Sequence, residues 1–343
     1  MKKKGIELEK LSRYRGELMG LAIIFVMLFH VGLHRGDMFF GLKRMGNIGV
    51  DMFLFLSGIG LWFSWSQTPH TMKFLYKRML RIYPVWLIVS TLYYVPDFYF
   101  PNLVKHSGHS TNAIDLIGDI AINWDFWIND ELTFWYIPAT MMLYLFTPVY
   151  LRLIIKAPVY RWLPAVMMVW SVIVAYVAPI HNTVGHIEIF WSRLPIYFIG
   201  LNFGVAVKEK KRLDGSAIWL IGFVFLLTLS TCIYLEQVKH GRFPLFLERM
   251  VYIPFTITSL LLLCELLTKT PQGLRKIFLF IGGISLEIYL IHHHFILIYI
   301  EQLKCTYWVK FLLTLVITLP LAWLLHKGVN KLVRVIETKI ASA

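Results

Sequence analysis

Several ionisable side chains stand inside long apolar runs of the sequence, where they could do chemistry. His30 ends the run LMGLAIIFVMLFH, and Asp51 lies near the start of the run GVDMFLFLSGIGLW. Arg193 lies in FWSRLPIYFIGLNFG, whereas Glu287 and His292 lie in GGISLEIYLIHHHFILIY. A titratable or charged residue in such a run is costly, so each is a candidate functional residue. The imidazole of His30 suits proton transfer at neutral pH.

A second set of charges is the basic stretch MKFLYKRMLRIYPVW, residues 72–86. Lys77 and Arg81 are four residues apart and Arg78 and Arg81 are three apart, so a helical start to the stretch would bring the cations together. Such cations could bind phosphate, to which arginine gives forked hydrogen bonds. They could equally serve only to orient the chain in a membrane. Pro84 is expected in the first turn of the helix that follows.

Other interpretations stay open for single residues. His30 could simply form a hydrogen bond with a backbone carbonyl or a neighbouring hydroxyl. Asp51 and Arg193 could have no role beyond marking the outer membrane interface. The run His292–His294 is poorly arranged for a metal, because successive helical residues point in different directions. We therefore expect no metal site.

The composition indicates a multi-pass membrane protein. The chain of 343 residues is 57% hydrophobic with a mean hydropathy of +0.63, whereas soluble domains are about 45–50% apolar. Its apolar stretches are about 17–25 residues long, which is the length that a helix needs to cross a bilayer. We predict an all-α polytopic bundle of about ten transmembrane helices, at roughly 17–35, 47–66, 83–99, 134–152, 162–179, 190–207, 215–235, 249–267, 278–299 and 308–326.

The positions of the basic residues predict that both termini are cytoplasmic. Most of the 34 lysines and arginines fall in the tails and alternate connections that this orientation places inside. The formal charge of +14 then needs no nucleic acid, and no nucleic-acid-binding motif accompanies it. We predict one membrane domain over 1–343, with a basic tail at 1–16, a bundle at 17–326 and a cytoplasmic tail at 327–343.

The longest polar connection, roughly residues 100–133, is expected outside the membrane. Its stretch AIDLIGDIAIN has the apolar spacing of a short surface helix. Aromatic residues crowd this side, and most fit the interfacial belt. Trp135 is the one that we retain as a candidate for stacking against a sugar ring.

In this order, the stretches resemble the acyltransferase 3 family, bacterial multi-pass membrane enzymes that O-acylate carbohydrates, commonly with acetyl groups. The resemblance runs from about residue 12 to 325 and includes RIYP, FWYIPATMMLYLFTPV and SLEIYLIH. The family usually has an arginine eleven residues before the histidine, where this chain has Met19. Arg15 lies one helical turn earlier and is expected to reach the same region.

The resemblance implies an acyl-CoA donor, in the first place acetyl-CoA, that arrives from the cytoplasm as a co-substrate rather than a permanently bound cofactor. It implies a carbohydrate hydroxyl as acceptor on the outer side of a bacterial cytoplasmic membrane, among membrane lipids. The residues that would hold the donor's phosphates are Arg15, Lys77, Arg78 and Arg81.

Our hypothesis is direct transfer with His30 as general base and Asp51 orienting its ring. The oxyanion would be stabilised by Arg193, Tyr289 or a backbone amide near Gly58. Further candidate substrate contacts are Trp135, Glu287 and His292. Ser57 could instead be an acylated nucleophile, although the chain has no GxSxG elbow.

A transporter or flippase of a glycan or small anion is the alternative, with no chemical turnover. It predicts two pseudo-symmetric halves with helices broken at matching positions, and we find no such repeat. Binding of labelled acyl-CoA would separate the two functions. The acceptor, the acyl chain length and the oligomeric state, homo-oligomer included, stay open.

Overall fold

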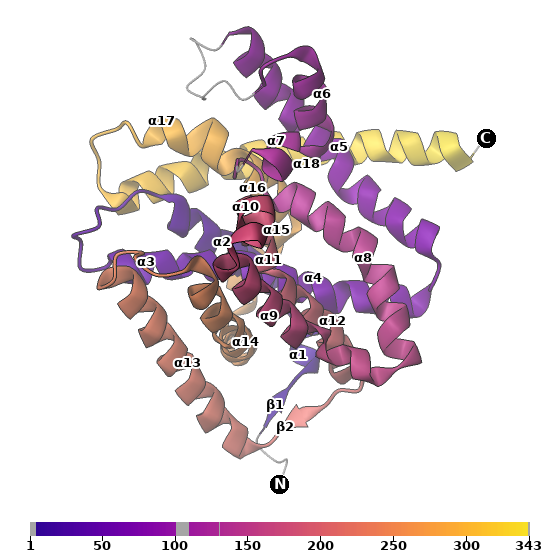
Figure 1. Ribbon diagram of the computed structural model, residues 1–343, viewed down its shortest axis with the longest axis vertical. Coiled ribbons are helices and arrows are strands. Elements are labelled where there is room, and N and C mark those ends of the chain that lie inside the picture. Colours follow the sequence, from indigo (N-terminus) through magenta and orange to yellow (C-terminus); the bar gives the residue numbers. More distant parts are fainter. Residues whose placement is uncertain (1–4, 101–109, 130, 342–343) are drawn as a thin grey trace.

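The computed structural model describes residues 5–100, 110–129 and 131–341, and this part of the chain is almost entirely helical (Figure 1). The all-α prediction is confirmed. The first four residues of the predicted basic tail and residues 101–109 of the outer connection lie outside the described residues.

The elements of the first half are β1 (Ile6–Glu7), α1 (Glu9–Arg13), α2 (Arg15–His30), α3 (Phe40–Arg44), η1 (Met45–Asn47), α4 (Ile48–Gln67), α5 (Thr71–Tyr99), α6 (Ala113–Ile122), α7 (Trp124–Ile128) and α8 (Tyr136–Lys156). Those of the second half are η2 (Pro158–Trp162), α9 (Leu163–Tyr176), α10 (Ala178–Val184), η3 (Gly185–Ile187), α11 (Glu188–Trp191), α12 (Leu194–Lys208), β2 (Arg212–Leu213), α13 (Gly215–Gln237), α14 (Leu245–Lys269), α15 (Gln272–Gly283), α16 (Ser285–Ile291), the π-helical η4 (His292–Leu297), α17 (Ile298–Ile300) and α18 (Tyr307–Ala341).

Within the described residues, six helical segments are long and apolar enough to cross a membrane. They are Phe40–Gln67, α8, Pro158–Tyr176, α13, α14 and α18 without its last residues. The α10–α11 segment with α12, bent by 42°, would make a seventh. A multi-pass membrane protein is thus supported. The count of ten stays a prediction, because α2, α5 and the broken segment α15–α17 do not meet the same test.

Three helices differ from their predicted bounds. Helix α5 starts at Thr71, so Pro84 lies inside it and the expectation of a helix start at Pro84 is wrong. The basic stretch continues the same helix because its residues are good helix formers. Helix α18 extends to Ala341, through most of the predicted tail. The predicted span 278–299 is broken at Ile284 and again at the π-helical turn that begins at His292.

The outer connection contains the predicted surface helix. Asn112 caps α6, because its side-chain oxygen accepts hydrogen bonds from the backbone amides of Ile114 and Asp115. Helix α6 ends at Asn123, which adopts a left-handed conformation at φ 52°. The short helix α7 follows directly and packs against η3.

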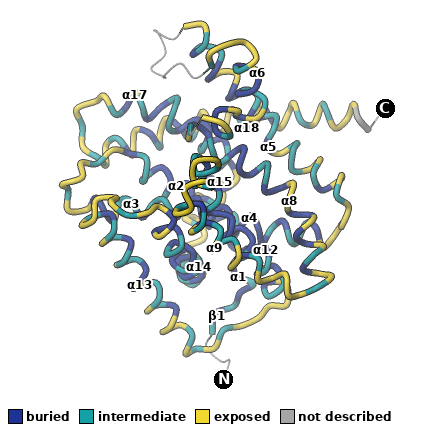
Figure 2. The backbone as a smooth tube through the Cα atoms, in the orientation of Figure 1, coloured by how far each residue is buried: buried dark blue, intermediate teal, exposed yellow. Residues whose placement is uncertain are grey.

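Burial separates a central layer from peripheral helices (Figure 2). The most apolar window of Phe40–Gln67 is 72% buried, whereas that of α13 or α18 is 22% buried. Large apolar side chains on α13, among them Trp219, Leu220 and Phe223, are therefore exposed. A soluble protein rarely exposes such a surface, whereas an apolar surface is expected where a helix contacts lipid hydrocarbon.

A two-stranded sheet ties the N-terminal tail to the α12–α13 connection. Strand β1 pairs antiparallel with β2 in the register Ile6 to Leu213 and Glu7 to Arg212. An ion pair between Arg212 and Glu7 adds to this register. The tail and this connection consequently lie on the same side of the bundle.

Two helix pairs approach so closely that their backbones touch. A Cβ atom on Gly282 of α15 would lie 2.0 Å from the carbonyl oxygen of Gly16 in α2, and one on Gly20 would lie 2.1 Å from that of Phe278. Helices α4 and α12 meet in the same way, since a Cβ on Gly200 would lie 2.3 Å from the Phe55 oxygen. Small residues at facing positions allow this close packing. The seam between α2 and α15 fixes the helix that ends in His30 against the segment that leads to His292.

We expect Gly282→Ala to lower the midpoint of thermal unfolding, because the added methyl group meets backbone that cannot move alone. Overpacking of this kind typically costs about 1–3 kcal/mol. The matched control is Gly222→Ala in α13, where a Cβ meets nothing within 4 Å. The control should be neutral or stabilising, since alanine suits a helix interior better than glycine by about 0.5–1 kcal/mol. Equal unfolding midpoints for the two variants in detergent would contradict the close backbone contact between α2 and α15.

Candidate active site

Two histidines from distant parts of the chain meet in the bundle. His30 is the last residue of α2, and His292 is the first residue of η4. The Nε2 atom of His292 lies 3.0 Å from Nδ1 of His30, and the two ring centroids are 5.0 Å apart. His292 is 1% exposed, whereas His30 is half-buried.

The hydrogen bonds of this pair determine its tautomers when both rings are neutral. Nδ1 of His292 faces the carbonyl oxygens of Ile288 at 2.8 Å and Tyr289 at 3.0 Å, so Nδ1 must carry a proton. Its Nε2 is then unprotonated and accepts a hydrogen bond from Nδ1–H of His30. This leaves Nε2 of His30 unprotonated and without a hydrogen-bond partner among the described residues. It is therefore free to accept a proton.

The π-helical turn explains why adjacent histidines share one partner. The ring of His293 also lies 5.0 Å from that of His30, so both rings pack on the same imidazole. His294 lies on another side, 4.7 Å from the ring of Phe134 and 5.3 Å from that of Tyr93. A π-bulge changes the phase of a helix and is frequent at functional sites.

Asp51 lies in a separate buried pair. Its Oδ1 atom is 3.5 Å from Nε of Arg193, and both side chains are 2% exposed. Arg193 also donates to Oδ1 of Asn47 at 2.7 Å and stacks over Trp135 at 4.9 Å. No hydrogen bond joins Asp51 to His30 among the described residues. The structure thus places His292, and not Asp51, beside His30.

Arg249 of α14 belongs to the same charged group and was missed by the sequence reasoning. It acts electrostatically on both Asp51 and Arg193 and is 9% exposed. The sequence could have indicated Arg249, because Glu248 and Arg249 stand at the start of the predicted span 249–267. The pair Asp51 and Arg193 therefore joins α4 to the start of α12, with the buried Arg249 of α14 close enough to act on both charges.

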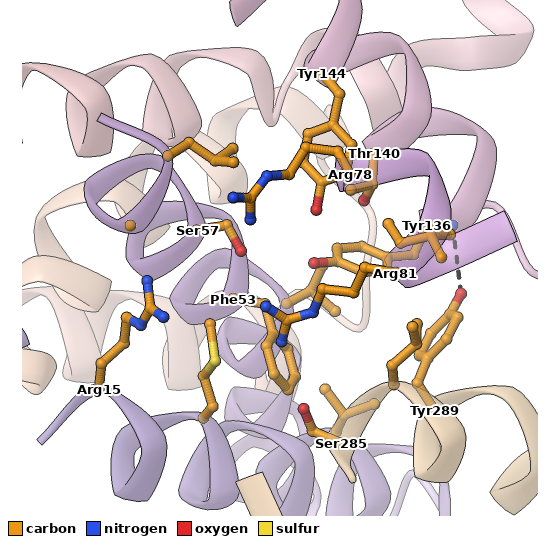
Figure 3. A pocket seen from close by; sticks show the side chains of 17 residues that line it. Arg15, Phe53, Ser57, Arg78, Arg81, Tyr136, Thr140, Tyr144, Ser285 and Tyr289 are labelled. Carbon is orange, nitrogen blue, oxygen red and sulfur yellow. Dashed lines mark hydrogen bonds between the residues drawn. The ribbon is translucent and has the colours of Figure 1, made fainter. Parts of the chain in front are cut away.

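Three arginines point into one cavity of ≈ 80 Å³, hereafter the arginine cavity (Figure 3). Arg15 comes from α2, and Arg78 and Arg81 come from α5. Arg78 donates to Oγ of Ser64 at 2.8 Å, and neither Arg15 nor Arg81 has a hydrogen-bonding or ionic partner within the described part. The lining contains no aspartate or glutamate. The cavity is strongly positive and suited to a polyanion.

Arg15 reaches the region of Met19, as expected from their spacing. Both residues line the arginine cavity. The guanidinium of Arg15 lies across Gly60 of α4, where a Cβ atom would be 1.7 Å from Nη1. Only glycine leaves room for this arrangement.

The far end of the arginine cavity approaches the histidines. Val26 lines it and precedes His30 by one helical turn, roughly 6 Å along the axis. Tyr289 lines it as well and precedes His292 by three residues. The hydroxyl oxygen of Tyr289 accepts a hydrogen bond from the backbone amide of Tyr136 at 3.3 Å, so its own proton is available to another acceptor.

A comparison with known protein families identifies the family of the chain. A family model described as an acyltransferase domain matches residues 18–327. The chain belongs to the acyltransferase 3 family. No curated protein and no solved structure matches it.

Two of the candidate residues of this acyltransferase lie in a second cavity. Lys77 and Glu287 line a space of ≈ 320 Å³ between α5, α16 and α18, which shares Arg81, Ser285 and Leu286 with the arginine cavity. The carboxylate of Glu287 is 2.7 Å from Nδ1 of His326. Neither Lys77 nor Glu287 lines the arginine cavity.

Ser57 lines the arginine cavity, but no histidine hydrogen-bonds its hydroxyl among the described residues. Gly58 lies at the seam between α4 and α12, where a Cβ would be 2.5 Å from the Tyr197 carbonyl oxygen. Its amide is part of helix α4 and does not point into the cavity as an oxyanion donor.

One group of carboxylates in the described residues has a spacing that a metal could use. Asp115, Asp119 and Asp125 bring ligand atoms within 4.8 Å of one another in the outer connection. Both oxygens of Asp119 already accept hydrogen bonds, from Ser110 and from the backbone amide of Asp125. Burial raises the pKa of Asp119 to about 6, because it disfavours the charged form of the carboxyl group. The group fits an internal cap of α7 better than a cation site.

We expect Gly60→Ala to displace the Arg15 guanidinium without unfolding the protein, because the atom in the way is the end of a flexible side chain. The variant should then lose affinity for a polyphosphate ligand, by about as much as Arg15→Ala does. A charged hydrogen bond is worth about 1.5–3 kcal/mol, so the expected loss is about tenfold to a hundredfold. Calorimetric titration with acetyl-CoA measures it, with Gly222→Ala as control. Affinity of Gly60→Ala equal to that of the wild type would contradict the contact.

Proposed function

We propose that the protein transfers an acyl group, in the first place acetyl from acetyl-CoA, to a hydroxyl of a carbohydrate or glycoconjugate on the outer side of a bacterial cytoplasmic membrane. Membership of the acyltransferase 3 family supports acyl transfer in general. The observation that carries the choice of donor is the arginine cavity, with three guanidinium groups and no carboxylate in its lining.

The pyrophosphate and the pantetheine arm of coenzyme A match this cavity in charge and in width. The pyrophosphate offers pairs of anionic oxygens that the planar guanidinium of arginine binds through paired hydrogen bonds. The pantetheine arm is slim and neutral, as a cavity of only ≈ 80 Å³ requires. The arm would run from the arginines past Ser57 and Tyr289 towards the histidine pair.

In the proposed reaction, Nε2 of His30 takes the proton from the acceptor hydroxyl while that oxygen attacks the thioester carbonyl carbon. The tetrahedral oxyanion accepts a hydrogen bond from the Tyr289 hydroxyl. The carbon–sulfur bond then breaks, and the imidazolium of His30 returns the proton to the coenzyme A thiolate. His292 holds the His30 ring in the basic tautomer, the role of the carboxylate in a serine-protease triad.

The proposal keeps ten spans with both termini in the cytoplasm. The pairing of β1 with β2 supports it, because both segments lie on one side of the bundle, as that topology requires. Arg15, Arg78 and the start of α5 then face the cytoplasmic supply of acyl-CoA. His30 lies at the outer end of α2, where a carbohydrate can arrive.

The buried residues around Asp51 act by positioning in this mechanism. Trp135 lies under the Arg193 guanidinium, so its ring is already engaged on one face. The carbohydrate is therefore proposed to reach His30 past the half-buried His293, whose ring lies 5.0 Å from that of His30.

We expect His30→Ala to bind acetyl-CoA normally and to transfer nothing measurable, since a general base contributes about 10²–10⁴-fold to the rate. Arg81→Ala should show the opposite pattern, with donor affinity about tenfold to a hundredfold lower and partial turnover at saturation. The assay is release of coenzyme A thiol by protein in liposomes supplied with a panel of methyl glycosides. Lys331→Ala, a surface cation of α18, is the control. Turnover by His30→Ala at the wild-type rate would refute the base assignment, and wild-type protein that binds no acyl-CoA would favour the transporter alternative.

We expect His292→Phe to lower kcat about tenfold to a hundredfold without changing the affinity for acetyl-CoA, because the ring of His30 loses the acceptor that sets its tautomer. Phenylalanine fills the buried space and keeps the packing against Tyr289. The split between kcat and donor affinity is the informative measurement, since a merely structural defect would change both. Unchanged kcat would show that His30 needs no partner.

A further inference from the structure

The second cavity adjoins the arginine cavity but differs from it in shape and charge. Its volume of ≈ 320 Å³ exceeds that of the arginine cavity. The two share Arg81, Ser285 and Leu286, so a ligand in one can continue into the other. Its two cations, Lys77 and Arg81, face two carboxylates, Glu287 and Glu337. The formal charges of its lining therefore cancel, but neither Lys77 nor Arg81 forms an ion pair among the described residues.

A chain of hydrogen bonds orients one amide of this cavity. Nδ1 of His326 lies 2.7 Å from the Glu287 carboxylate and therefore carries a proton. Nε2 of His326 then accepts a hydrogen bond from Nδ2 of Asn330 at 2.8 Å. Asn330 is left with its carbonyl oxygen and its second N–H, and the side chain is exposed to the cavity.

An asparagine amide presented in this way pairs with an adenine edge. The carbonyl oxygen accepts from the exocyclic N6 amino group, and the N–H donates to N7, which is the paired contact by which asparagine reads adenine. Lys77 lies one helical turn before Arg81 on α5 and has no hydrogen-bonding or ionic partner among the described side chains. It can bind a phosphate next to the base.

The arginine cavity is too small for a whole coenzyme A molecule, since ≈ 80 Å³ holds only a slim group. We infer that the second cavity binds the 3′-phosphoadenosine end of the donor, with Asn330 on adenine, Lys77 on the 3′-phosphate and Arg81 on the pyrophosphate at the junction. This inference rests on the proposed function, because it places the other end of the same acyl-CoA. It assigns Glu287 and His326 to positioning Asn330.

The test compares two donors that differ only in this end. Acetyl-CoA carries the nucleotide, and S-acetyl-4′-phosphopantetheine does not. Asn330→Ala should lower kcat/KM for acetyl-CoA about tenfold, the scale of one paired base contact, and leave kcat/KM for the short donor unchanged. Lys331→Ala, at the next position of α18 and outside the cavity, should affect neither donor. Lys77→Ala should reduce the preference for acetyl-CoA over its 3′-dephospho form.

Binding of adenosine 3′,5′-bisphosphate gives a readout that does not depend on turnover. Wild-type protein should bind it, and Asn330→Ala should bind it about tenfold more weakly. The inference would be overturned if Asn330→Ala lost kcat/KM equally with both donors, or if it bound the bisphosphate as tightly as the wild type. The proposed function would still stand in that case, provided that the wild type transfers the acyl group. Absence of transfer from either donor in the wild type would remove the proposed function, and this inference with it.

Discussion

The backbone contact between α2 and α15 is the constraint on which the site depends. Side chains normally keep packed helices 8–10 Å apart, but here Gly20 and Gly282 let one helix rest on the carbonyl oxygens of the other. Helix α2 carries Arg15 at one end and His30 at the other, so the seam fixes both ends of the site. The backbone contact thus holds Arg15 and His30 against the segment that leads to Tyr289 and His292.

Charge is divided between two kinds of buried environment. Asp51 and Arg193 neutralise each other at a helix junction, which is where buried charges are tolerated. Arg15 and Arg81 have no such partner in the described chain. The half-buried Arg15 loses hydration without compensation, whereas Arg81 is exposed. An anionic ligand restores that compensation. The paired charges thus stabilise the bundle, whereas the unpaired cations are available to bind an anion.

The sequence indicates which residues are candidates for the site but not which residues they contact. His30, Arg15, Arg78 and Arg81 stand out because ionisable residues are conspicuous in apolar runs, and the structure places all four at or near one cavity. The pairing of His30 with His292 was not predictable, because it depends on a π-helical turn that local sequence does not signal. Likewise, α5 begins at Thr71, so Lys77 is helical and lines the second cavity. A helix that begins only at Pro84 would not have determined where the Lys77 side chain points. Contacts between distant helices, such as Glu287 with His326, are set by tertiary packing alone.

The position of Tyr289 favours direct transfer over an acylated Ser57. Ser57 lines the arginine cavity without a histidine to remove its proton, whereas His30 lies one helical turn beyond Val26 at the far end. Tyr289 also lines this cavity, and its hydroxyl is held by the Tyr136 amide. A neutral pantetheine arm can enter a cavity of ≈ 80 Å³, but a nucleotide bearing several negative charges cannot do so without losing its hydration. In the proposed reaction, the charged end of the donor therefore stays with the arginines, and only the thioester reaches His30 and the acceptor hydroxyl.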